Sequence, residues 1–208
     1  EPLDFSTEHA WREIRAQYFG SVTLVDRGVG IILKALEESG QADNTIIVFT
    51  SEHGDMLGDH YMLHKTTMYD ESASVPLIVH VPWLNNAQKV LNGPVSQIDL
   101  VPTLLELLEQ SIPDKLQGKS LVPVLCGETD LTDNDVIIQW NGPNNRMIGW
   151  DTGILPRDQS RAISLAPART IVSGDGWKLN LVPGDRAELY DVNTDPYEMT
   201  NMADEPAH

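Results

Sequence analysis

Apolar residues spaced three and four positions apart predict one long helix near the start of the chain. The helix runs from about Thr7 to Ser39, and Gly40 follows as the expected stop. Gly28 and Gly30 lie inside the pattern, where each costs about 1 kcal/mol relative to alanine. We interpret both as sites of close packing against a neighbouring element. The predicted apolar face consists of Val22, Val25, Val29, Ile32, Leu33 and Leu36.

Two uninterrupted apolar runs follow, at Thr45–Thr50 and Val75–Val81. Runs of this kind are typical of strands in a parallel sheet that is covered on both faces, so we expect both to be fully buried. A second helix is predicted from about Ile98 to Glu109, with Ser96 or Asp99 as its cap. The predicted fold class is therefore α/β, with part of a mostly parallel sheet flanked by helices.

The pattern changes after about Asp133, where short strands replace the longer elements. Residues 174–176 form a tight turn between two of them, and residues 141–161 are expected to be a loop. We therefore divide the chain into an α/β part at 1–132 and a small antiparallel subdomain at 133–208. The four predicted strands are Val136–Trp140, Arg169–Ser173, Trp177–Val182 and Glu188–Val192.

The amino-acid composition excludes several classes of binding partner and of metal site. The 208 residues include 31 acids and 14 Lys or Arg, for a net charge of −17. This charge argues against binding to nucleic acid or to an anionic membrane surface, since both require cationic patches. No apolar run approaches the roughly 20 residues of a membrane-spanning helix. Cys126 is the only cysteine, so an intrachain disulfide and a thiolate metal cluster are both excluded.

The first predicted strand ends in a short polar segment that favours metal chemistry. Glu52 and His53 follow the strand, and Gly54 allows the chain to turn. In open α/β sheets, ligands bind beyond the carboxyl ends of the strands. A carboxylate with one imidazole suits Ca²⁺, Mg²⁺, Mn²⁺ or Zn²⁺. A local hydrogen-bonded turn is the alternative interpretation of the same pair.

A lone basic residue follows in an acidic stretch. Lys65 is the only Lys or Arg in residues 35–88, which contain eight acids. It is either an anion-binding residue near a metal or a surface lysine paired with Asp59, Asp70 or Glu71. His60 and His64 have the spacing of a helical zinc pair, but Gly58 argues against a stable helix there.

These residues and their order resemble the sulfatases of the alkaline-phosphatase-like superfamily. The resemblance includes Asp26 and Gly30 of the first helix, the run from Asp43 to His60 and His64-Lys65, and it extends over nearly the whole chain. Its other parts are Tyr69–Glu71, Val75–Val79, Val95–Leu105, Gly118–Leu121 and Glu188–Asp191.

The resemblance implies a role for each candidate residue. Glu52 and His53 would ligate a divalent cation, most often Ca²⁺, although the family usually has Asp where this chain has Glu. Lys65 would bind the sulfate group, and His64 would contact the sulfate or donate a proton. The implied substrate is a sulfated small molecule or glycan.

The resemblance also shows what this chain lacks. The family's nucleophile is a formylglycine, made from a Cys or Ser in a Cys/Ser-x-Pro/Ala-x-Arg motif. Cys126 lies in Leu-Cys-Gly-Glu and does not match. The chain also begins Glu1-Pro2, without Met. We therefore expect the C-terminal half of a sulfatase, inactive alone, whose partner is the N-terminal half of the same protein or a second copy.

Two other functions remain open on the sequence. A phosphonate or phosphate monoester hydrolase of the same superfamily would use the same metal and lysine. A noncatalytic, sulfatase-like binding module would retain the fold without the chemistry. The compartment, exported or cytoplasmic, is left open as well.

Overall fold

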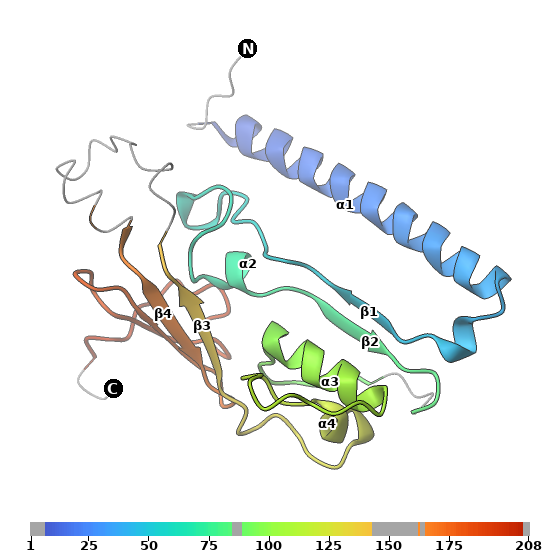
Figure 1. Cartoon of the computed structure of the whole chain (residues 1–208). Helices are drawn as coiled ribbons and strands as arrows, with labels where there is room; N and C mark the ends of the chain where they lie inside the picture. The colour runs from blue at the N-terminus through green and yellow to red at the C-terminus, as the bar shows by residue number, and fades with distance from the viewer. Residues whose placement is uncertain (1–6, 85–88, 143–161, 163–164, 206–208) are drawn as a thin grey trace. The chain divides into compact units, whose positions relative to one another are not determined.

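The computed structural model describes residues 7–84, 89–142, 162 and 165–205. It separates into two compact units, residues 1–87 and residues 88–208 (Figure 1). The boundary expected at 132/133 falls within the second unit and stays a prediction. Most of the loop expected at 141–161 lies outside the described residues.

The first unit begins with the long helix α1 (Glu8–Glu38), close to the predicted bounds. The Thr7 hydroxyl caps the helix by accepting a hydrogen bond from the Ala10 amide at 3.4 Å. The helix ends where the Ser39 amide donates to the Ala35 carbonyl, and Gly40 turns the chain with a φ of 71°. The predicted helix and its glycine stop are both confirmed.

The apolar face of α1 is not covered within this unit. Val22, Val25 and Ile32 are all exposed, Ile32 by 68%. A Cβ atom placed on Gly28 or Gly30 would meet nothing within 4 Å. The close packing that we inferred for these glycines is therefore absent among the described residues.

Two short strands form the sheet of the first unit, β1 (Ile47–Thr50) and β2 (Leu77–His80). They pair antiparallel, so the predicted parallel sheet is not confirmed. The expectation of full burial is wrong within this chain, because Ile78 is 61% exposed. A two-stranded ribbon without layers on both faces leaves such side chains open. The remaining elements of this unit are η1 (Ala42–Asn44), η2 (Asp59–Tyr61) and α2 (Asp70–Ala73).

The second unit opens with a capped helix, as predicted. Ser96 and Asp99 form a capping box at η3 (Gln97–Asp99), which leads into α3 (Leu100–Leu107). Asp99 is buried, and its Oδ1 also accepts from the Lys119 amide at 2.9 Å. Asp99 thus joins the start of α3 to the segment before α4. The next helix is α4 (Val122–Cys126). The hydrophobic core of this part consists of Leu121, Val124 and Leu131, with Val95 packed against them.

A four-stranded antiparallel sheet completes the second unit and confirms the antiparallel strands predicted at the C-terminal end of the sequence. Its strands follow the order of the sequence, β3-β4-β5-β6. The predicted turn at 174–176 lies between β4 and β5, where the Gly176 amide donates to the Ser173 carbonyl at 3.0 Å. The strands are β3 (Val136–Trp140), β4 (Ala168–Val172), β5 (Trp177–Leu181) and β6 (Glu188–Asp191).

This sheet buries polar side chains in matched pairs. Lys178 Nζ lies 2.7 Å from Glu198 Oε1, and neither side chain is exposed to solvent. The Thr170 hydroxyl donates to the Asn180 side-chain oxygen at 2.6 Å, also within the sheet. Such pairing offsets the cost of burying polar and charged groups.

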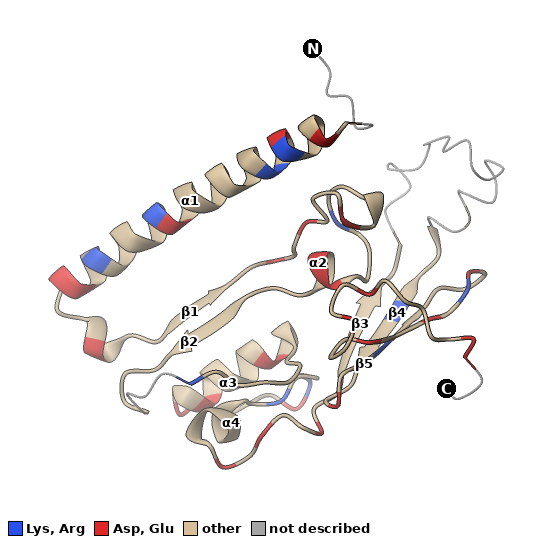
Figure 2. Cartoon of the chain, turned by 180° about the vertical axis from the view of Figure 1, so that it is seen from behind, with Lys and Arg blue, Asp and Glu red and all other residues tan. Residues whose placement is uncertain are grey.

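The excess of acidic over basic residues in the composition is also seen in the structure. Acidic side chains outnumber basic ones along the described ribbon, as Figure 2 shows. Asp130 is one exposed example, and the hydrogen bonds donated by Thr132 lower the pKa of its carboxyl. A membrane-spanning helix is not found among the described residues.

Candidate functional site

The turn that follows β1 depends on a glycine. The Gly54 amide donates to the Ser72 carbonyl at 2.8 Å, which ties the turn to α2. A Cβ atom at Gly54 would lie 2.0 Å from the Glu71 carbonyl oxygen, far inside van der Waals contact. Only glycine allows this approach, so the turn role inferred from the sequence is supported by the close contact with α2.

Glu52 and His53 bring their polar atoms together at this turn. His53 Nε2 lies 3.9 Å from Glu52 Oε2. The other ring nitrogen, His53 Nδ1, lies 2.8 Å from the Gly54 carbonyl oxygen. Because a carbonyl oxygen only accepts, this contact is a hydrogen bond when Nδ1 carries the ring proton, and in that neutral tautomer Nε2 holds the lone pair.

This geometry fits two ligands of one cation. Ligand atoms at about 2.4 Å from a Ca²⁺ ion lie roughly 3–5 Å apart, which includes the observed 3.9 Å. A hydrogen bond from the second ring nitrogen to a carbonyl is a common way to orient a histidine ligand. Thr50 Oγ1 and Glu71 Oε2, on the segments that flank the turn, are buried polar atoms without a hydrogen-bond partner in the described part of the chain.

The described residues supply only part of a metal site. No group of three or more His, Cys, Asp or Glu side chains placed to hold a metal occurs among residues 7–84, 89–142, 162 and 165–205. Ca²⁺ takes 6–8 oxygen ligands, so Glu52 and His53 would need donors from elsewhere. With a protonated imidazole, the same contact is an ion pair, which is the alternative that the sequence left open.

A closed loop connects this pair to His64 and Lys65. The Met56 amide donates to the His64 carbonyl at 2.7 Å, and the Gly58 amide donates to the Met62 carbonyl at 2.9 Å. These bonds fold residues 56–64 back on themselves, so Glu52–His53 precede the loop and Lys65 follows it. The structure thus places all four candidate residues around one loop.

Lys65 does not form the surface ion pairs considered from the sequence. It is exposed, and no ion pair joins it to Asp59, Asp70 or Glu71 among the described residues. Asp59 instead lies 3.6 Å from the guanidinium of Arg15. The only Lys or Arg of residues 35–88 is therefore available to an anion.

His60 and His64 do not form a helical zinc pair. The η2 segment is a single 3₁₀ turn, and His60 has a φ of 50° inside it. The His60 ring stacks on Tyr69, with centroids 3.8 Å apart and planes 8° from parallel. The argument against a stable helix here is confirmed.

The loop concentrates backbone strain. Five of the seven described non-glycine residues with positive φ fall within residues 57–66. Each such conformation costs about 1–3 kcal/mol and persists only where surrounding contacts enforce it. Strain of this kind clusters at functional sites, which favours a functional role for the loop. The five residues are Leu57, His60, Tyr61, His64 and Thr66, with φ between 47° and 82°.

Sequence reasoning missed two residues of α1 that contact this loop, Trp11 and Arg15. Arg15 Nε donates to the Leu57 carbonyl at 3.0 Å across 42 positions of sequence. Their spacing of four places both on one helix face, but nothing local in the sequence points to residue 57.

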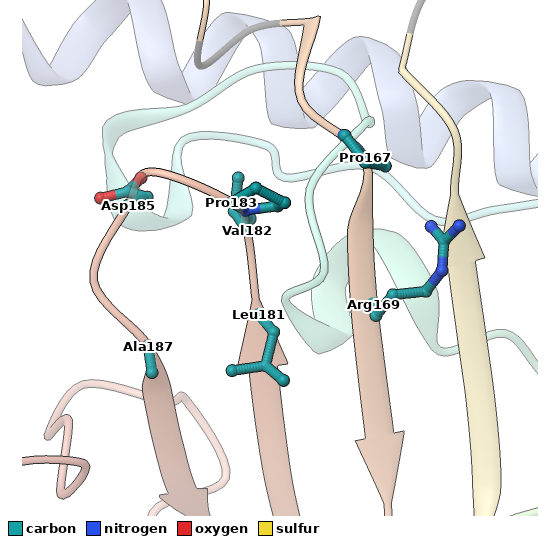
Figure 3. A pocket seen from close by; sticks show the side chains of 7 residues that line it. All are labelled: Pro167, Arg169, Leu181, Val182, Pro183, Asp185 and Ala187. Atoms are coloured by element: carbon teal, nitrogen blue, oxygen red, sulfur yellow. The ribbon is translucent and has the colours of Figure 1, made fainter.

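A hollow in the second unit contains none of the predicted site residues. It has a volume of about 440 Å³ and lies beside β4 and β5 (Figure 3). Arg169, its one cationic side chain, already donates to the Trp140 and Ala168 carbonyls and to the Asn141 side chain. The predicted site residues lie instead in the segment that follows β1.

Comparison with known families decides the membership of this chain. The family model described as "Sulfatase" matches residues 4–110, about half of the sequence and all of the site. The chain belongs to the sulfatase family. The resemblance drawn from its motifs is confirmed, as is the α/β fold class.

Individual relatives of this sulfatase-family chain span more than one chemistry. Arylsulfatase K of Xenopus laevis is 32% identical over 202 residues, covering 95% of this chain and 35% of the relative. The solved phosphonate monoester hydrolase of Silicibacter pomeroyi is 29% identical with a TM-score of 0.78, covering 97% of this chain and 39% of that one.

A second solved structure adds information on a ligand. The protein BT4656, solved with its substrate D-glucosamine-2-N,6-O-disulfate, is 29% identical with a TM-score of 0.72. The match covers 89% of this chain and 35% of that one. This sulfatase-family chain thus spans little more than a third of the length of the relatives it matches.

Proposed function

We propose that this chain is the C-terminal part of a sulfatase that hydrolyses sulfate esters. Its formylglycine nucleophile would lie in a segment outside this sequence. The observation that carries the proposal is the convergence of Glu52 Oε2 and His53 Nε2 to 3.9 Å, with Nδ1 held by the Gly54 carbonyl. Family membership over residues 4–110 supports it.

Glu52 and His53 are the residues that would hold a divalent cation, with Ca²⁺ as the proposed ion. When bound, such a cation supplies positive charge to the oxygens of the sulfate group. The Gly54 carbonyl keeps the proton of His53 on Nδ1 and so leaves Nε2 free for ligation. Ligands beyond this pair would come from outside the described residues.

Lys65 would bind the sulfate oxygens directly. In a chain of net charge −17, an exposed ammonium with no acidic partner in the described part of the chain is the local feature that favours an anion. Its donors would stabilise charge that builds on the oxygens as the ester bond breaks. His64, next to it, would contact the sulfate or donate a proton to the leaving oxygen.

The role of Lys65 is testable in the full-length protein with 4-nitrophenyl sulfate. Lys65→Ala should lower kcat/KM by about 10²–10³, the usual effect of removing one donor to developing charge. Lys34→Ala is the matched control, because Lys34 is an exposed lysine of α1. Equal activity of the two variants would refute the role of Lys65. The 208-residue chain alone should show no turnover.

The metal ligands are testable by calcium titration of the full-length protein. Glu52→Gln keeps the size of the side chain but removes its charge, so Ca²⁺ affinity should fall about tenfold or more. Glu13→Gln on the exposed surface of α1 is the control. Unchanged affinity in Glu52→Gln would show that the Glu52–His53 contact is only a local ion pair.

A second candidate function is hydrolysis of phosphonate or phosphate monoesters. The similarity to the phosphonate monoester hydrolase of Silicibacter pomeroyi favours it. The kcat/KM values for 4-nitrophenyl sulfate and 4-nitrophenyl phenylphosphonate separate the two functions. No turnover of either ester and no Ca²⁺ binding would instead indicate a noncatalytic module.

The proposed substrate class is a sulfated glycan or small molecule. The disulfated glucosamine bound to BT4656 supports a sugar substrate. Release of inorganic sulfate from a panel of sulfated monosaccharides would identify the preferred position.

A further inference from the structure

The strained loop that precedes Lys65 is shaped by its own hydrogen bonds. The Met56–His64 and Gly58–Met62 backbone bonds close it, and Asp55 Oδ1 accepts from the Leu57 amide at 3.0 Å. All of these partners lie within residues 55–64. They set the shape of the loop but do not anchor its outer end to another element.

Beside the stacking of His60 on Tyr69, helix α1 anchors the loop. Arg15 Nε donates to the Leu57 carbonyl at 3.0 Å, and its Nη2 lies 3.6 Å from Asp59. A Cβ atom on Gly58, between these two contacts, would lie 2.7 Å from the Trp11 ring and 3.3 Å from Arg15 Nη2. The helix therefore presses against the loop where only a glycine fits.

We propose that Arg15 is a positioning residue that holds the loop carrying His64 and Lys65. Its planar guanidinium uses two different nitrogens, Nε for the hydrogen bond to the Leu57 carbonyl and Nη2 for the contact with the Asp59 carboxylate. A lysine has a single nitrogen and cannot reproduce both directions. The effect on catalysis rests on the proposed function, whereas the effect on the loop does not.

Hydrogen exchange of the 208-residue chain tests the anchor directly. Arg15→Leu should speed exchange of the Gly58 and Met62 amides about tenfold and leave the β1 amides unchanged. Arg15→Lys should restore part of the protection. Arg12→Leu, which removes an exposed arginine three residues earlier on the same helix, should change neither set of amides.

Two outcomes would overturn the proposal. One is normal protection of the loop amides in Arg15→Leu. The other is equal acceleration of the loop and β1 amides, which would indicate a general loss of stability.

Activity of the full-length protein provides a separate readout. Across wild type, Arg15→Lys and Arg15→Leu, kcat/KM for a sulfate ester should fall in the order in which loop protection falls. Constant kcat/KM despite lost protection would overturn the positioning role. If the wild type hydrolyses no sulfate ester, the proposed function fails, while the exchange data still decide whether Arg15 anchors the loop.

Discussion

Both units of this chain leave large apolar side chains exposed, but the second unit buries more polar contacts. In the second unit, the antiparallel sheet buries Lys178, Glu198 and Thr170 in matched polar contacts. In the first unit, α1 and β2 leave large apolar side chains such as Ile32 and Ile78 exposed. Among the described residues, the first unit buries few side chains (Ala10, Met56, Ser72 and Val81), although it holds the strained loop. Large contiguous apolar patches on a protein surface commonly mark sites of protein–protein contact.

The largest effect on stability is expected from a substitution inside the second unit. Lys178→Met would leave the Glu198 carboxylate buried without its cation, which should cost about 3–5 kcal/mol of unfolding free energy. Urea denaturation followed by tryptophan fluorescence measures the loss. Lys34→Met, at a lysine whose side chain is 74% exposed, should change stability little.

The double variant Lys178→Met/Glu198→Leu separates a lost pair from lost packing. It should recover most of the stability, because no buried charge remains. A double variant as unstable as Lys178→Met would show that the contacts of the lysine stem, and not charge pairing, stabilise this region.

A smaller effect on stability is expected from a substitution at the candidate site of the first unit. In Gly54→Ala the new methyl group would overlap the Glu71 carbonyl, 2.0 Å away, and the turn must shift. Overpacking of this kind costs about 1–3 kcal/mol. The His53 ring should also lose its fixed orientation, which nitrogen NMR shifts of the imidazole would report. Unchanged chemical shifts and unchanged stability would contradict the close contact between this turn and α2.

Sequence reasoning succeeded where local patterns determine structure. The helical spacing and Gly40 located α1, the Ser96–Asp99 spacing located the cap of α3, and the glycines at 174 and 176 located a hairpin turn. Each of these signals lies within a few residues of the feature that it predicts.

Sequence reasoning failed where the answer depended on distant surfaces. The apolar runs at β1 and β2 indicated burial, but a run of residues does not show which layers cover it or in which direction its neighbour runs. The contact of Arg15 with Leu57 was missed for the same reason, since it joins positions 42 residues apart. The contact between Glu52 and His53, in contrast, joins neighbours in the sequence, and the metal role of this pair stays a prediction.

The smallest effect on stability is expected at Gly28, where a substitution tests whether the apolar face of α1 is covered. A Cβ atom on Gly28 meets nothing within 4 Å, so Gly28→Ala in this chain should gain the helix propensity of alanine. The expected gain is about 0.5–1 kcal/mol of unfolding free energy, measured by urea denaturation. The same substitution in the full-length protein should instead destabilise it if another surface packs closely against this face of the helix. A gain in both proteins would show that the glycine is not a packing site, and that the exposed face of α1 remains open around Gly28.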